Sequence, residues 1–163
     1  MACRRVSCWS QHVYAEGVAP VPADQGGDAV PLCGSDDLAV VVQWEHSGRG
    51  LDGQVIAENV GVRACRLAYK PEVTPLQPDG TPLPVETLVT LEEKIPAYVI
   101  IEPGQRAAAR VHWGSWCGQQ ASDRARVDWY GGSTVAKVHG PTQPECSPGQ
   151  PDNLTSSWFH LIT

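Results

Sequence analysis

Apolar and polar residues alternate along several short stretches of the chain, which is the pattern of half-buried β-strands. One such stretch is 38–44, whose apolar face carries Leu38, Val40, Val42 and Trp44. Comparable stretches follow at 54–60, 65–69, 85–91, 97–101 and 106–113. No segment places apolar residues at i, i+3, i+4 and i+7 over three turns, so helix should be scarce. The pattern predicts an all-β domain.

The clearest single element is a β-hairpin with strands at 124–130 and 133–139 around Gly131-Gly132. A two-residue turn there pairs residues whose numbers sum to 263, so that Val127 faces Ala136. One face of the hairpin is then apolar and the other charged, as a strand pair on the surface of a sandwich requires. We therefore expect a two-sheet antiparallel immunoglobulin-like β-sandwich of seven to nine short strands.

The distribution of glycine and proline predicts where the domain begins. Residues 17–27 are rich in Gly, Pro and Ala and have no apolar period, so 1–31 is predicted to be a flexible tail and 32–163 the β-sandwich domain. The proline-rich segment 71–84 is predicted to form edge strands or a loop, because proline cannot donate to a central ladder.

Length and charge narrow the class of protein. The chain has 163 residues, which is one domain by the usual prior. Its net charge is −6 and its basic residues are scattered, which argues against nucleic acid as a partner. No stretch approaches the roughly 20 apolar residues of a membrane helix. Arg4 and Arg5 are not followed by an apolar segment, so no signal peptide is visible in this chain.

Six cysteines are present, none of them in the Cys-x-x-Cys spacing of zinc or redox sites. Four cysteines allow three pairings, and spacing alone does not choose among them. Cys117 and Cys146 share the sum of 263 with the hairpin pairs, and Cys33 and Cys65 flank a hairpin centred between residues 48 and 50. This geometry favours the disulfides Cys33–Cys65 and Cys117–Cys146.

Disulfides would place the protein outside the reducing cytoplasm, secreted or attached to the envelope. The alternative is that the cysteines are free and buried, where they would pack as small hydrophobic residues. Cys3 and Cys8 remain unassigned.

The order of several short motifs resembles a family of domains of unknown function found in secreted proteins and lipoproteins of actinobacteria. The resemblance covers 32–161, and its landmarks are Cys33, Glu58-Asn-Val-Gly61 with Cys65-Arg-Leu67, Ile101-Glu-Pro-Gly104, Val111-His-Trp113 with Trp116-Cys117, and Pro144-Glu-Cys146. The family implies an exported immunoglobulin-like sandwich, often tethered to the envelope, and it implies no catalytic residues. This chain departs from the family in showing no lipobox or signal.

Nothing in the sequence assembles a recognisable active site. No two histidines are spaced for a local metal pair, although His112 and His139 could meet across a sheet. No Gly-x-Ser-x-Gly motif is present, although a triad could be assembled from distant residues. A hydrolase or metal carrier is therefore the least favoured reading, and we expect neither an enzyme nor a cofactor.

The tryptophans are the most suggestive residues. Trp44, Trp113 and Trp129 fall on apolar strand faces and are predicted to be core, whereas three aromatic residues are candidates for binding: Trp116, Tyr130 and Trp158. The leading hypothesis is a non-catalytic extracytoplasmic interaction domain whose partner is an envelope protein or a glycan. The alternative is a carbohydrate-binding module that stacks these rings on sugars.

Overall fold

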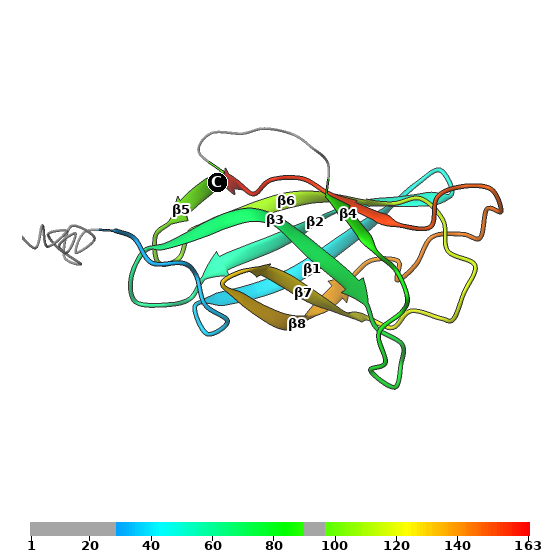
Figure 1. Ribbon diagram of the computed structural model, residues 1–163, viewed down its shortest axis with the longest axis horizontal. Helices are drawn as coiled ribbons and strands as arrows, with labels where there is room; N and C mark the ends of the chain where they lie inside the picture. The colour runs from blue at the N-terminus through cyan, green and yellow to red at the C-terminus, as the bar shows by residue number, and fades with distance from the viewer. Residues whose placement is uncertain (1–28, 90–96) are drawn as a thin grey trace, which may run out of the picture.

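The computed structural model describes residues 29–89 and 97–163, and within these ranges the chain forms ten β-strands and no helix (Figure 1). The longer strands are β1 (Leu38–Ser47), β2 (Gly50–Asn59), β3 (Cys65–Pro75), β6 (Arg106–Trp113), β7 (Arg124–Tyr130) and β8 (Gly132–His139). The short strands are β4 (Thr87–Val89), β5 (Tyr98–Ile101), β9 (Leu154–Ser156) and β10 (His160–Ile162). The all-β prediction is confirmed.

The strands form one curled mixed sheet in the order β4-β9-β6-β2-β1-β8-β7-β3-β5, with β10 also paired to β6. The pairs β1–β8 and β4–β9 are parallel, and the remaining pairs are antiparallel. The expected arrangement of two separate antiparallel sheets is not confirmed. The reason is that β1 pairs along both of its edges, with β2 on one side and β8 on the other, and so joins the two halves through backbone hydrogen bonds.

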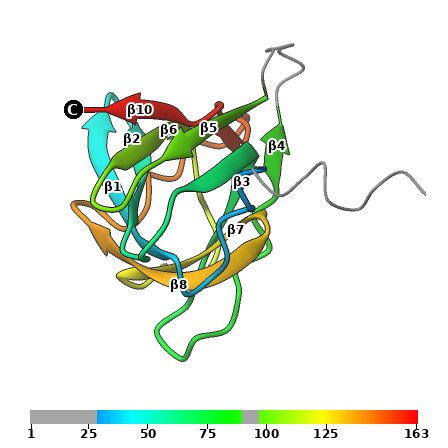
Figure 2. The same cartoon turned by 90° about the vertical axis from the view of Figure 1, so that its left-hand side faces the viewer.

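The sheet curls into a half-barrel around a tryptophan-rich core (Figure 2). Trp113 is fully buried and lies between Trp44 and Trp116, with ring centroids 6.4 and 5.9 Å away. Gly53 faces Trp44 in the β1–β2 register, and a Cβ atom there would lie 2.8 Å from the Trp44 ring. The three tryptophans predicted to be core, Trp44, Trp113 and Trp129, are all buried.

The two halves of the curl meet along a seam between β3 and the β4–β9 pair, and side chains bridge this seam. The Thr87 hydroxyl accepts from Val73 N and donates to Val73 O, and Ser156 Oγ donates to Pro71 O. Pro71, Val73 and Pro75 direct their backbone groups to the same edge because they alternate along β3. The two prolines have no N–H, so a continuous ladder cannot form on that edge.

Strand β3 is longer than predicted. The sequence pattern gives a strand at 65–69 followed by an edge strand or loop, but β3 continues through Pro71 to Pro75. Its pairing with β7 shifts between Ala68 and Glu72, which marks a β-bulge. Along the edge of β3 that faces away from β7, Cys65–Ala68 pair with β5, and the prolines lie beyond this paired part.

The predicted hairpin exists, but its register differs by two. Val127 pairs with Thr134 and Trp129 pairs with Gly132, so paired numbers sum to 261 rather than 263. The turn falls at Tyr130-Gly131, where Gly131 has a φ of 120° that favours glycine. Because the shift is even, every side chain keeps its predicted face, and Val127 and Ala136 are both buried.

Both predicted disulfides are present. Cys33 and Cys65 have Cα atoms 4.9 Å apart, and Cys117 and Cys146 have Cα atoms 4.6 Å apart. The two bridges differ in exposure: Cys33 and Cys65 are buried in the core, whereas Cys117 and Cys146 are both exposed. The first bridge therefore belongs to the core, and the second ties two surface loops together.

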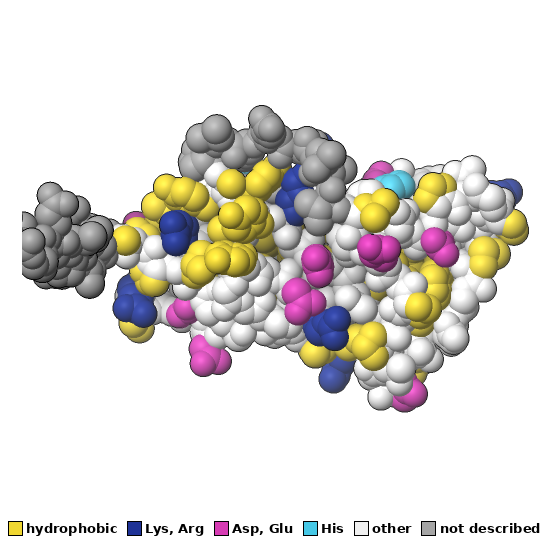
Figure 3. All heavy atoms as spheres, viewed as in Figure 1, with side chains coloured by type: hydrophobic (Ala, Val, Ile, Leu, Met, Phe, Trp, Pro, Cys, Tyr) yellow, Lys and Arg dark blue, Asp and Glu magenta, His cyan; other side chains and the backbone are white. Residues whose placement is uncertain are grey.

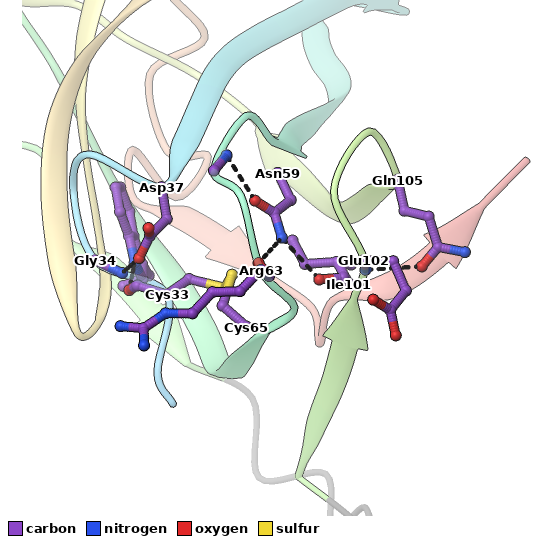
Figure 4. Close-up of a disulfide and its surroundings, with 11 residues drawn as sticks. Cys33, Gly34, Asp37, Asn59, Arg63, Cys65, Ile101, Glu102 and Gln105 are labelled. Atoms are coloured by element: carbon purple, nitrogen blue, oxygen red, sulfur yellow. Dashed lines mark hydrogen bonds between the residues drawn. A yellow bond between two sulfur atoms is a disulfide. The ribbon is translucent and has the colours of Figure 1, made fainter. Parts of the chain in front are cut away.

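A buried amide organises the corner beside the first disulfide (Figure 4). Asn59 is 1% exposed, and its Nδ2 donates to the carbonyls of Arg63 and Ile101 at 2.9 and 2.8 Å. Its Oδ1 accepts from Gly61 N at 2.9 Å, so both ends of the amide are satisfied. Trp129 packs at the same corner and donates from Nε1 to Cys33 O.

Some predictions fall on residues that the structure does not describe. Of the predicted tail, residues 1–28, which include Cys3 and Cys8, lie outside the described residues. Within its last three residues, the carbonyl oxygen of Pro31 accepts a hydrogen bond from Arg66 N. The predicted strand at 85–91 is reduced to Thr87–Val89, with residues 90 and 91 outside the described ranges. Over 29–89 and 97–163, no helix is long and apolar enough to cross a membrane.

Candidate functional site

Three aromatic side chains from distant parts of the chain gather on the surface, and we call them the aromatic cluster. Tyr69 lies near the middle of β3, Tyr130 ends β7, and Trp158 lies between β9 and β10. The Tyr69 ring is 5.2 Å from Tyr130 in an edge-to-face arrangement and 6.2 Å from Trp158. Tyr69 is 53% exposed and Tyr130 is 59% exposed.

The backbone at the bulge in β3 directs Tyr69 into the cluster. Tyr69 has a φ of 64°, and it is the one non-glycine residue with positive φ in the described part of the chain. This conformation costs an L-residue about 1–2 kcal/mol. Without the bulge, alternation from the buried Cys65 and Leu67 would turn Tyr69 inward. The strained backbone conformation at Tyr69 therefore directs its ring outward.

This strain predicts the outcome of two substitutions. Tyr69→Gly should be more stable than Tyr69→Ala by about 1 kcal/mol, because glycine adopts positive φ without a steric penalty. Urea denaturation of both variants measures the difference. Tyr98→Gly and Tyr98→Ala form the matched control pair on neighbouring β5, where alanine should be the more stable. Equal stability of the two Tyr69 variants would contradict a strained backbone at this position.

Apolar side chains and two cations extend the cluster. Tyr98 and Ile100 on β5 are exposed, and Figure 3 shows hydrophobic side chains gathered over β5 and the first part of β3. The Arg66 guanidinium lies 5.3 Å from the centroid of the Tyr98 ring, and Lys70 Nζ lies 5.3 Å from that of Trp158. Both distances are within cation–π range. Lys70 is buried beneath Trp158 and Arg66 is half-buried, so the surface itself is mainly aromatic and apolar.

The three aromatic residues predicted for binding separate into two groups. Tyr130 and Trp158 lie in the aromatic cluster, whereas Trp116 is 6% exposed. Its indole packs on Trp113, and its Nε1 donates to Gln119 O, so it belongs to the core. Tyr69 was not predicted, because the alternation of β3 places it inward. The prolines that follow it were the available signal of an irregular strand.

A pair of polar side chains lies on the outer face of the sheet, apart from the aromatic cluster. Asp52 on β2 and His112 on β6 are paired in register, and His112 Nδ1 lies 2.5 Å from Asp52 Oδ1. Hydrogen bonds from His112 and Ser47 hold the pKa of Asp52 below its ordinary value. The carboxylate fixes the histidine ring and leaves Nε2 facing away from Asp52.

The two histidines that could meet across a sheet lie apart. His139 on β8 pairs with Gln43 on β1, and β2 lies between β1 and the His112 strand. Three strand spacings separate the two residues by about 14 Å. In the described part of the chain, no three His, Cys, Asp or Glu residues are grouped to hold a metal ion.

Comparison with known proteins identifies the family. The family described as a domain of unknown function (DUF4232) matches residues 33–155, from the first disulfide cysteine into β9. The chain belongs to this family. The match includes both disulfides and the curled sheet apart from β10, and it agrees with the resemblance to a family of unknown function. No curated protein and no solved structure matches the chain. The actinobacterial origin and the export that the resemblance implies stay predictions for this DUF4232 domain.

Proposed function

We propose that this DUF4232 domain is a non-catalytic binding domain that works outside the reducing cytoplasm and holds a protein partner on the aromatic cluster. The observation that carries the proposal is the convergence of Tyr69, Tyr130 and Trp158, with both tyrosines more than half exposed. Tyrosine, tryptophan and arginine are enriched among the residues that dominate binding energy in protein interfaces.

The two disulfides support the proposed compartment. Bridges of this kind persist in oxidising environments and are rare in the cytosol. The exposed Cys117–Cys146 bridge is the more informative of the two, because cellular reductants would reach it in a folded cytosolic protein. A secreted or envelope-attached domain would keep it.

The arrangement of the rings favours a protein partner over a glycan. Tyr69 and Tyr130 meet at an interplanar angle of 79°, so one ring edge covers part of the other ring face. A sugar that stacks on aromatic residues needs an open, flat ring face, and these two tyrosines do not share one. An uneven aromatic surface with the half-buried Arg66 beside Tyr98 suits the irregular shape of a protein surface. The carbohydrate-binding module stays the alternative, supported by the exposure of Tyr130.

Photo-crosslinking tests the proposal. We expect a benzoylphenylalanine introduced at Tyr130 to form a specific adduct with one protein when the full chain is produced and exported in its host. A hot-spot aromatic residue contributes about 2 kcal/mol or more, so Tyr130→Ala should weaken binding of the captured protein by about 30-fold. Calorimetry with the purified partner measures this change.

Val62 provides the matched control, because it is an apolar residue that is 97% exposed in the β2–β3 loop. The same crosslinker at Val62 should capture no specific protein, and Val62→Ala should leave affinity unchanged. Identical adducts from both positions would contradict a dedicated surface. Binding to a glycan array that Tyr130→Ala abolishes would instead establish the carbohydrate-binding alternative.

A further inference from the structure

The outer face of the sheet carries a groove with a volume of about 600 Å³, separate in composition from the aromatic cluster. It crosses β1, β2, β6 and β9 and contains the Asp52–His112 pair. Its side chains are amides, carboxylates, hydroxyls, an arginine and a histidine. Val111 is the one large apolar residue among its lining residues, and it is buried. We call this hollow the polar groove.

Strand register arranges the polar groove as two parallel rows of side chains. The first row crosses the strands in the order Glu45, Asp52, His112 and Thr155. The second row crosses them in the order Gln43, Gln54, Arg110 and Ser157. Residues two apart on a strand face the same side, so the two rows are neighbours on one surface. The sheet itself positions them, without a mobile loop.

The groups in the polar groove combine donors and acceptors at short spacing. An amide side chain carries both a donor and an acceptor, and Gln43 and Gln54 place two such groups side by side. Arg110 adds donors, and Glu45 adds acceptors. Among the described residues, the side chains of Gln43, Gln54 and Arg110 have no intramolecular hydrogen-bond partner, so they are available to a ligand.

The polar groove carries charged groups of both signs. Asp52 is paired with His112, and Glu45 lies in the row next to Arg110. Because both signs are interleaved at short spacing, the groove gives no strong preference to an anion or a cation. A lining of this kind also offers little to an apolar ligand, which needs apolar walls.

We propose that the polar groove binds a neutral saccharide. A sugar hydroxyl is both a donor and an acceptor, so a ring with several hydroxyls can satisfy the alternating amide, carboxylate and guanidinium groups of the two rows at once. The Asp52–His112 pair would present acceptor positions to it in a fixed orientation. The site is independent of the protein-binding surface proposed above, since no residue of the aromatic cluster lines it.

A titration followed by nuclear magnetic resonance tests the proposal. The full chain, labelled with ¹⁵N, is titrated with four neutral disaccharides (cellobiose, maltose, lactose and trehalose), with glucuronate as a charged comparison. We expect at least one neutral disaccharide to shift the amides of residues 52–54 and 110–112. Arg110→Ala should then weaken that binding by about 10-fold or more, because hydrogen bonds to charged groups are the stronger ones.

Arg106→Ala is the matched control, because Arg106 lies on the same face of β6, is exposed, and is outside the polar groove. It should leave the affinity unchanged. Silence of all four disaccharides overturns the proposal, as does binding of glucuronate alone. Shifts confined to Tyr69, Tyr98 and Tyr130 also overturn it, and they would place the sugar on the aromatic cluster instead. Residues 157 and 158 are left out of the mapping, because these chain neighbours belong to different surfaces.

Discussion

Gly53→Ala is expected to destabilise this domain strongly. A Cβ atom at Gly53 would lie 2.0 Å from the carbonyl oxygen of Gln43 and 2.8 Å from the Trp44 ring. The oxygen belongs to the backbone of β1, which is held by β2 on one side and β8 on the other, so it cannot withdraw without breaking the sheet. Overpacking of a core typically costs about 1–3 kcal/mol and occasionally more, which is a large share of a total free energy of unfolding of about 5–15 kcal/mol. Soluble yield and urea denaturation measure the effect.

Gly80→Ala is the control for this prediction. Gly80 has a φ of 87°, but a Cβ atom there would meet no heavy atom within 4 Å. The substitution should therefore cost only the conformational penalty of about 1–2 kcal/mol and leave a folded protein. If both variants were equally stable, the close approach of β1 at Gly53 would not be what makes glycine necessary there.

The second large effect concerns the disulfides, which should be reduced in a fixed order. A mild reductant should open Cys117–Cys146 first, because both of its cysteines are exposed, and should spare the buried Cys33–Cys65 until the domain unfolds. The bridges close segments of 29 and 32 residues, so each contributes about 3–4 kcal/mol in the chain-entropy account. Loss of both approaches the whole stability of a domain.

Alkylation followed by mass spectrometry counts the free thiols at each stage. The paired variants Cys117→Ala with Cys146→Ala and Cys33→Ala with Cys65→Ala separate the two contributions. We expect the first pair to leave a folded, less stable domain, and the second pair to cost more, since it also leaves a cavity in the core. Simultaneous reduction of both bridges in the native protein would contradict the predicted order.

The covalent framework and the faces of the strands could be predicted from the sequence. Successive residues of a strand face opposite sides, so a register error of two leaves each side chain on its predicted face. Val127 and Ala136 were therefore correctly predicted to be buried, although their register was wrong by two. Strand β6 was predicted at its full length because its ends coincide with a turn and a glycine. The parallel pairing of β1 with β8 could not be predicted, since it joins residues 96 apart through three register pairs and leaves no local signal.

The candidate sites were harder to predict. Trp116 was a candidate for binding because it lies in a loop next to Cys117, outside the predicted strands, but its ring packs against Trp113 in the core. Tyr69 was missed because the bulge inserts two extra residues in β3 between Ala68 and Glu72 and turns Tyr69 to the side opposite to the one that alternation assigns. The polar groove depends on which strands become neighbours, and Gln54 and Arg110 are adjacent only because β2 and β6 pair. Such sites follow from topology, which a single sequence encodes weakly.

The prolines along the outer edge of β3 also determine how the domain deforms. Between neighbours in the strand order, parting two strands means breaking consecutive backbone hydrogen bonds, but between β3 and the β4–β9 pair the described residues are bridged by the hydroxyls of Thr87 and Ser156. The domain is therefore stiff around most of its circumference and compliant along one line. Trp158 follows β9 closely in the chain and contacts Tyr69 across that line, so widening of the half-barrel would separate the rings and alter the surface they form.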